Sequence, residues 1–249
     1  MDLLYTHEVT RDTLWQGRLV FWQPARGKGY RFNLDPVLLA DFVSPGEQCL
    51  DLGCGVLVVG MLLLASHKVS YVTGVEVQPS LAALAEQNVV ENAMDQKAKV
   101  LLGDCRHLSL PLVDRVVFNP PYFPSQTGRA APQEGRDAAR HERYGTLADF
   151  VGCAVKHLKP EGCLAAIVPS GRTQELFRLL FSAGFDRARR RWVVPRQGEA
   201  PGHALIEARF IHQPKADTLP LIDEEAPLIV HQGAGREYSS EVNRMLAGV

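Results

Sequence analysis

The chain has 249 residues, of which 46% are hydrophobic and 22% are charged. These fractions are those of a folded globular protein, so they exclude a disordered or fibrous chain. Its 27 Lys and Arg residues against 28 Asp and Glu residues give a formal net charge of −1. This near-neutral balance excludes a surface that is basic throughout. A nucleic acid would therefore have to be bound by a local basic patch.

The five cysteines form no C-x-x-C pair, and no histidines have the spacing of a zinc or haem site. We therefore expect reduced thiols and no bound metal. Residues 1–8 carry acids where a signal peptide needs positive charge. The longest apolar run, residues 56–65, is about half of the ~20 residues that a membrane span needs. The expected compartment is the cytoplasm, without membrane contact.

Residues 1–46 are predicted to form a short N-terminal cap that ends in a helix. The expected strand covers residues 19–23 and is followed by a glycine-containing turn. A helix is expected over residues 37–43, with Asp35 as its N-cap and Pro36 at the first helical position, where a missing N–H costs nothing.

From residue 49 onward, short apolar strands alternate with stretches of helix length, a pattern typical of a parallel sheet with helices on both faces. The expected strands are residues 49–53, 72–77, 100–102, 116–119 and 164–168. The expected helices are residues 57–66, 80–92 and 147–158.

After a further expected helix at residues 173–183, strands at 191–194 and 204–211 are joined by a Gly/Pro loop. They predict an antiparallel hairpin at the sheet edge. An edge hairpin could pair with a second copy of the chain, so a homo-oligomer is a possibility that the sequence does not decide. We therefore predict one α/β domain, residues 47–213, with a doubly wound, mostly parallel, seven-stranded sheet of Rossmann-like type. Residues 214–249 are expected to form an extension packed on it.

The segment from Asp51 to Gly55, Asp-Leu-Gly-Cys-Gly, lies between an expected strand and an expected helix. Glycines there allow a sharp turn and close approach of a ligand to the backbone. A dinucleotide fingerprint would need glycine at position 58, which is Val58. The spacing instead resembles the D/E-x-G-x-G-x-G motif of class I S-adenosylmethionine-dependent methyltransferases, with Leu57 in place of the third glycine.

Two acids lie at the ends of the next two expected strands. Glu76 is placed to accept hydrogen bonds from both hydroxyls of a ribose, and Asp104 is placed to accept one from an adenine amino group. Taken singly, the first is as well explained as a solvated carboxylate and the second as a loop residue. Because the carboxyl ends of parallel strands share one edge of the sheet, together they favour a nucleoside site.

The most specific feature is Asn-Pro-Pro-Tyr at residues 119–122, directly after an expected strand. It resembles the motif of methyltransferases that act on planar amino or amide nitrogens. The Asn119 side-chain oxygen and the Pro120 carbonyl oxygen can accept the two hydrogens of such a nitrogen and free its lone pair. Pro121 stiffens the backbone, and Tyr122 can stack on a base. These four are the candidate catalytic residues.

Further segments carry a family resemblance over most of the chain. They are Gln23 with residues 29–40, and residues 85–89, 139–142 and 238–242. On these segments and the two motifs, the chain resembles the small-domain family of bacterial N-methyltransferases, and within it the members that methylate adenosine N6 in tRNA. The resemblance implies S-adenosylmethionine as cofactor, and tRNA, through its single-stranded anticodon loop, as substrate. The candidate cofactor-binding residues are then Arg31, Asp51, Gly53, Cys54, Gly55, Glu76, Val77, Asp104, Cys105 and Asn119.

Three clusters of cations are candidates for RNA contact: residues 187–196 with five arginines, the loop at 129–143 with four, and Arg26, Lys28 and Arg31. Each is also explained as a solvated charged face. The loop is favoured as the clamp because it follows the Asn-Pro-Pro-Tyr motif. The target adenosine would have to be flipped out or already unstacked.

Other functions stay open on the sequence. Protein glutamine N5-methyltransferases share the Asn-Pro-Pro-Tyr motif, as do other amino-methyltransferases of rRNA or DNA. A scaffold that binds the cofactor without turnover is a hypothesis of a different class, motivated by Leu57.

Overall fold

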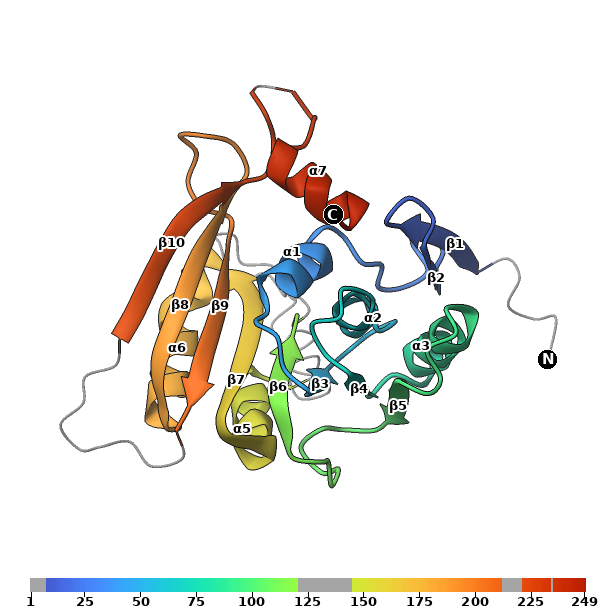
Figure 1. Ribbon diagram of the computed structural model, residues 1–249, viewed down its shortest axis with the longest axis horizontal. Coiled ribbons are helices and arrows are strands. Elements are labelled where there is room, and N and C mark those ends of the chain that lie inside the picture. The colour runs from blue at the N-terminus through green and yellow to red at the C-terminus, as the bar shows by residue number, and fades with distance from the viewer. Residues whose placement is uncertain (1–7, 121–144, 212–220, 234) are drawn as a thin grey trace, which may run out of the picture.

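The computed structural model describes residues 8–120, 145–211, 221–233 and 235–249. An eight-stranded sheet runs through it in the order β10-β8-β9-β7-β6-β3-β4-β5, and helices cover both of its faces (Figure 1). Among the described residues, no helix is long and apolar enough to cross a membrane.

Five strands form the parallel part of the sheet, as predicted. Each of them is paired in parallel with its neighbours in this part of the sheet. Four of them are largely buried between helix layers on both faces, which explains their nearly continuous apolar runs, whereas the strand at the edge of the sheet is only partly buried. They are β3 (Gln48–Leu52), β4 (Tyr71–Glu76), β5 (Ala98–Leu102), β6 (Val113–Phe118) and β7 (Leu158–Pro169).

The helices form two layers, each with its own apolar core. One layer holds α1 (Asp35–Phe42), α2 (Val58–Ala65) and α3 (Pro79–Glu91). The other holds α5 (Leu147–His157) and α6 (Thr173–Ser182). Thr146 caps α5 and exchanges hydrogen bonds with Asp149 in a capping box, which sets where this helix begins.

The C-terminal strands differ from the prediction. β8 (Phe185–Val194) and β9 (His203–Phe210) form the expected antiparallel hairpin, but β10 (Leu221–Ile229) pairs in parallel with β8. The sheet therefore has eight strands instead of seven, and the hairpin is not at its edge. β10 was missed because its first half is acidic; those acids face the arginines of β8, with Arg187 Nε 2.7 Å from Asp223 Oδ2.

The first and last described elements lie together outside the main sheet. β1 (Val9–Leu14) and β2 (Leu19–Pro24) form a separate antiparallel hairpin, and α7 (Ser240–Ala247) lies near it (Figure 1). Trp15 Nε1 donates a hydrogen bond to the Met245 carbonyl oxygen at 2.9 Å. On the other side, Asn88 Oδ1 of α3 accepts from the Trp22 backbone N–H at 2.7 Å. The hairpin is thus tied to both α3 and α7.

The start of α1 differs from the prediction by one residue. Its N-cap is Leu34, without a side-chain hydrogen bond, and Asp35 is already helical. Asp35 Oδ2 accepts from Asn33 Nδ2 at 2.8 Å, and the Asp35 N–H donates to Asn33 Oδ1 at 3.0 Å. Asn33 takes the capping role expected of Asp35, because its carbonyl oxygen reaches the N–H at the helix start.

Candidate active site

The turn between β3 and α2 carries the glycine motif. Gly53 and Gly55 have φ values of 65° and 56°, in the left-handed region that glycine adopts without strain. Asp51 is buried in β3, and its Oδ2 accepts from the Gly60 N–H at 3.0 Å. The carboxylate therefore holds the start of α2 against the strand that precedes the turn.

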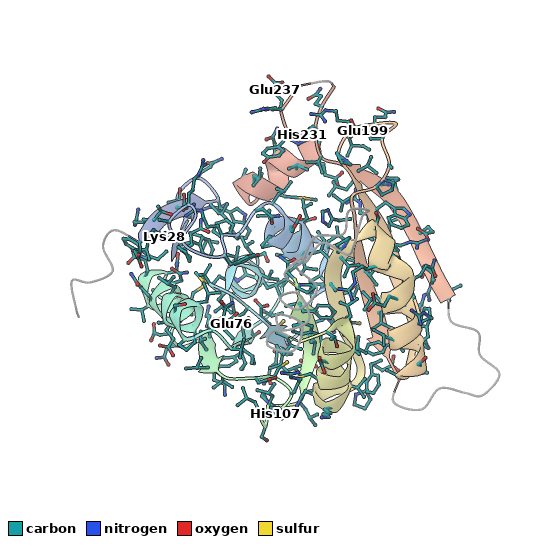
Figure 2. The ribbon with its side chains drawn as sticks, turned by 180° about the vertical axis from the view of Figure 1, so that it is seen from behind. Lys28, Glu76, His107, Glu199, His231 and Glu237 are labelled. Atoms are coloured by element: carbon teal, nitrogen blue, oxygen red, sulfur yellow. The ribbon has the colours of Figure 1, made fainter. Side chains whose placement is uncertain are left out.

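Glu76, the last residue of β4, is tied to the same turn. Its Oε2 accepts from the Gly55 N–H at 2.9 Å and its Oε1 from the Gln78 N–H at 2.8 Å. Figure 2 shows Glu76 in the interior of the molecule rather than at its rim. Both oxygens accept hydrogen bonds from the backbone, so the carboxylate is held in a fixed position at the turn.

The two buried acids affect each other electrostatically. Burial and the nearby Glu76 charge raise the pKa of Asp51 to about 7, although a hydrogen bond from Gly60 opposes the shift. Burial also raises the pKa of Glu76. A site with two partly desolvated carboxylates favours hydroxyl donors and cationic groups as ligands.

Leu57, which stands in place of the motif's third glycine, has a φ of 66° and is fully buried. Its side chain belongs to the core on the α1–α3 side of the sheet and does not line the cavity at the turn. The substitution therefore leaves the surface that would face a cofactor unchanged.

A cavity at the turn brings the two motifs together. Asn119, directly after β6, lines it with Asp51, Gly53 and Cys54. Pro120 follows Asn119 and is buried. Pro121 and Tyr122 lie outside the described residues, as does the loop at 129–143. The structure thus confirms that the glycine turn and the start of the Asn-Pro-Pro-Tyr motif are neighbours.

Two aromatic residues that the sequence did not single out also line this cavity, Tyr30 and Phe32. Tyr30 lies over the glycine turn, since its Cε1 is 3.4 Å from where a Cβ of Gly55 would be. Burial and the charges of Asp35, Asp51 and Glu76 raise its pKa to about 12. The only signal for these residues was their place in the segment after Gln23, which resembles the family.

With Tyr30 in this position the cavity is small, about 20 Å³. Small-molecule sites are commonly about 300 Å³ or larger. The glycine turn, Asp51 and Glu76 fit a nucleoside cofactor by their chemistry, but the cavity has to widen before such a ligand can enter.

Phe150 of α5 is a further contributor that sequence reasoning missed. It stacks on Phe118, the last residue of β6, with ring centroids 5.2 Å apart. The same ring lies 3.6 Å from where a Cβ of Gly53 would be. It therefore supports both motifs from the far helix layer. Its sequence signal, one aromatic on an amphipathic helix, is common to most core residues.

Asp104 lies just beyond β5, where it was expected, but it is paired. Arg106 Nε is 2.9 Å from both of its carboxylate oxygens, and this contact lowers the pKa of Asp104. The Cys105 carbonyl oxygen accepts from the Cys153 thiol of α5 at 3.4 Å. The loop is thus held to α5, and an adenine would share Asp104 with Arg106.

Of the remaining cofactor-binding candidates, two lie at the glycine turn and one does not. Cys54 donates its N–H to the Val75 carbonyl at 3.0 Å, and Val77 directly follows Glu76, so both stay at the turn. Arg31 instead faces the N-terminal hairpin, with Nη2 2.9 Å from Asp12 Oδ2, and is not among the residues that line the described cavity. The structure does not bring it to the other cofactor candidates.

The arginine-rich strand, the first candidate for RNA contact, is largely neutralised. Four arginines of β8 form ion pairs with acids of β9, β10 and α7, and Arg196 pairs with Glu199 at 3.6 Å. The pairs are Arg187 with Asp223, Arg189 with Glu207 and Glu225, Arg190 with Glu224, and Arg191 with Glu241. This patch serves to attach β10 and α7 to the sheet and offers little free positive charge.

No group of three or more His, Cys, Asp and Glu side chains within the described ranges is placed to hold a metal ion. A glycine turn after the first parallel strand, an acid at the end of the second, and Asn-Pro after the fourth meet at the carboxyl edge of a doubly wound sheet. This combination defines a class I methyltransferase.

Comparison with known proteins agrees with this assignment to the class I methyltransferases and identifies the family. The model of the methyltransferase small domain family matches residues 35–182. The chain belongs to this family, and S-adenosylmethionine is the cofactor that the family and the fold indicate.

Curated relatives carry a more detailed name. A tRNA1(Val) (adenine(37)-N6)-methyltransferase of Porphyromonas gingivalis is 29% identical over 88% of this chain and 88% of its own length. A protein of the same name from Pasteurella multocida is 30% identical over 79% of this chain and 83% of its own length.

Solved structures share the fold. A predicted O-methyltransferase from Agrobacterium tumefaciens has a TM-score of 0.66 at 24% identity and covers 86% of this chain and 96% of its own. The TYW2 protein of M. jannaschii in complex with AdoMet has a TM-score of 0.57 at 16% identity, with 83% and 91% covered. At these identities the likeness concerns the fold alone.

Proposed function

We propose that this methyltransferase transfers a methyl group from S-adenosylmethionine to the N6 amino group of an adenosine in tRNA, near the anticodon, in the cytoplasm. The observation that carries the proposal is that Asn119 lines the same cavity as the glycine turn. The names of the curated relatives support tRNA adenosine as the substrate.

S-adenosylmethionine supplies an electrophilic methyl group on a sulfonium. Glu76 would bind the ribose hydroxyls, because its carboxylate is held at the turn by the Gly55 and Gln78 N–H groups. Asp51 orients the turn through Gly60. These residues position the cofactor and exclude water, which is where most of the rate acceleration of such a transfer comes from.

Asn119 and Pro120 would act on the nucleophile. The N6 nitrogen of adenine is a weak nucleophile because its lone pair is delocalised into the ring. The Asn119 side-chain oxygen and the Pro120 carbonyl oxygen accept its two hydrogens, which favours a tetrahedral nitrogen with a free lone pair. The nitrogen would form a bond to the methyl carbon as the carbon–sulfur bond breaks, which would leave S-adenosylhomocysteine, and the nitrogen would release one proton to solvent.

The direct test is incubation of the purified protein with labelled S-adenosylmethionine and unmodified tRNA, followed by digestion to nucleosides. The expected product is labelled N6-methyladenosine. Release factor and ribosomal RNA serve as alternative acceptors, because protein glutamine and rRNA amino groups suit the same chemistry. Absence of label in any tRNA, with label in one of these acceptors, would contradict the proposal.

The hypothesis of a scaffold without turnover loses its motive. It was based on Leu57, and that side chain packs in the core instead of the cavity. Calorimetric titration with S-adenosylmethionine tests this point separately. Binding is expected; binding without any methyl transfer would favour the scaffold, and an absence of binding would contradict both hypotheses.

A further inference from the structure

A second hollow lies beside the cofactor cavity. It is a groove of about 430 Å³ between the N-terminal hairpin, the start of α1 and the C-terminal extension. Phe32 lines both the groove and the cofactor cavity. Pro36 lines the cavity and Val37, the next residue, lines the groove. The two hollows are therefore adjacent, with Phe32 between them.

One wall of the groove is a preformed aromatic pair. His231 and Tyr238 face each other in an isolated antiparallel bridge, and their rings stack with centroids 5.3 Å apart and planes 14° apart. His231 Nδ1 donates to the Arg236 carbonyl oxygen at 3.2 Å. The segment between the two stacked residues forms a loop. Figure 2 shows His231 at the base of this loop beside α7 and Glu237 at its outer end. Because the two rings are already held against each other, they present a flat π-surface that does not have to be ordered when a ligand binds. Such a surface suits a nucleobase.

Two cations lie on the segments that carry lining residues of the groove. Arg236 is in the loop between the two stacked residues, and Arg244 is on α7, which also carries the lining residue Leu246. Both are exposed, and neither forms an ion pair with a described residue. Arg18 of the N-terminal hairpin binds the Ala247 and Gly248 carbonyl oxygens at 2.8 and 2.9 Å. Its guanidinium therefore stays at the end of α7, where it adds a third positive charge.

We propose that this groove binds one nucleotide of the RNA substrate next to the target adenosine, with its base stacked on the His231–Tyr238 pair and its phosphates near Arg236 and Arg244. The inference rests on the proposed function. Rings, cations and a volume within the range of small-ligand sites suit a nucleotide better than a peptide, since none of the lining residues is acidic. This contact would hold the strand while the target base enters the cofactor cavity.

The test is equilibrium binding of a fluorescently labelled, unmodified tRNA anticodon stem-loop to the full chain in the presence of S-adenosylhomocysteine. Tyr238→Ala and His231→Ala should each raise the Kd for RNA roughly tenfold, the size expected for loss of one base–aromatic stack. Tyr238→Phe keeps the ring and should recover most of the affinity. Phe181→Ala is the matched control: Phe181 stacks on Phe177 at 5.6 Å on α6 and should leave the RNA Kd unchanged.

A second measurement does not depend on how the variants fold. Wild-type protein is cross-linked to the same RNA carrying a photoreactive base at each loop position in turn. Peptides that contain His231, Tyr238 or Phe32 should be labelled by one of these positions.

The outcomes separate the two proposals. RNA affinity that depends on Tyr238 and His231, without methyl transfer, would keep the groove and contradict the proposed function. Transfer by a protein whose RNA affinity is the same in both alanine variants, or the absence of cross-links to these peptides, would overturn the groove alone. Failure of the wild type to bind the RNA would also overturn the groove.

Discussion

Leu57 of the glycine turn packs into the space that Gly74 of β4 leaves open. A Cβ at position 74 would lie 2.5 Å from Leu57 Cδ1 and 2.9 Å from Cys54 Sγ. The left-handed conformation of Leu57 costs about 1–2 kcal/mol. Full burial of a leucine contributes about 1.5–3 kcal/mol, so packing offsets the strain. The motif has Leu57 where the pattern has its third glycine, and this leucine fits only because residue 74 of the neighbouring strand is a glycine.

Gly74→Ala should therefore destabilise the protein, because the added methyl group collides with Leu57 and Cys54 in the core. We expect a loss of about 1–3 kcal/mol, the usual cost of overpacking, measured as the change in unfolding free energy in urea. The turn that Glu76 holds would shift as well, so affinity for S-adenosylmethionine should fall.

Gly152→Ala is the matched control. Gly152 lies within α5, and a Cβ there would meet nothing within 4 Å. Alanine in a helix interior is favoured over glycine by up to about 1 kcal/mol, so this variant should be as stable as the wild type or more stable. Equal stability of the Gly74→Ala variant and the wild type would show that Leu57 can repack.

Asp51 gives a pH dependence of stability with a defined sign. Its pKa is raised from 3.8 to about 7 in the folded protein. Between these values the unfolded chain has lost the proton while the folded protein retains it, so stability falls as pH rises from 4 to 7 and levels off above 7. Three pH units correspond to about 4 kcal/mol.

Asp51→Asn removes this titration and keeps an oxygen that can accept from Gly60. The stability of the variant relative to the wild type should increase as pH rises from 4 to 8. The measurement is the free energy of unfolding in urea at each pH. Asp95→Asn, a change at an exposed aspartate, is the control and should show no such gain. A constant difference between Asp51→Asn and the wild type would contradict the raised pKa.

The parallel sheet was predictable because β3 and β6 are short apolar runs next to turn signals, a local property. β10 was not, because Asp223 and Glu224 are as polar as a loop. Their ion-pair partners are arginines on β8, about 35 residues earlier, and a series of ion pairs between two strands has no local signature in the sequence.

The site shows the same division. Gly53, Glu76 and Asn119 could be placed from the sequence because each is at the end of a strand, and parallel strands end at one edge. Tyr30 could not be placed, because its position over Gly55 depends on how the segment before α1 folds back across that edge. Asp104 was at the expected place, but its pairing with Arg106 depends on side-chain geometry that spacing does not encode.

Tyr30 should limit entry of the cofactor. Its ring lies over Gly55, and the cavity that it lines there is about 20 Å³, so we expect the ring to obstruct the path of the cofactor. Tyr30→Ala should therefore bind S-adenosylmethionine severalfold faster, as measured by stopped-flow fluorescence. Tyr30→Phe keeps the ring and should keep the slow rate. An association rate that is the same in all three proteins would show that the ring does not limit entry.

Asn119→Ala should separate chemistry from cofactor binding. The variant loses the oxygen that accepts a hydrogen of the target amino group, while Glu76 and its hydrogen bonds at the turn are unchanged. We expect kcat to fall about 100-fold, the size seen when one transition-state hydrogen bond is removed, with little change in the Kd for S-adenosylmethionine. Single-turnover transfer to tRNA and calorimetry measure the two quantities.

Asn119→Asp is the informative comparison, because a carboxylate keeps an acceptor at the same position. It should restore a large part of the rate lost in the alanine variant, which a purely structural role of Asn119 would not explain. If both variants lose rate and cofactor affinity together, Asn119 acts by holding the end of β6 in place instead of by accepting the amino hydrogen.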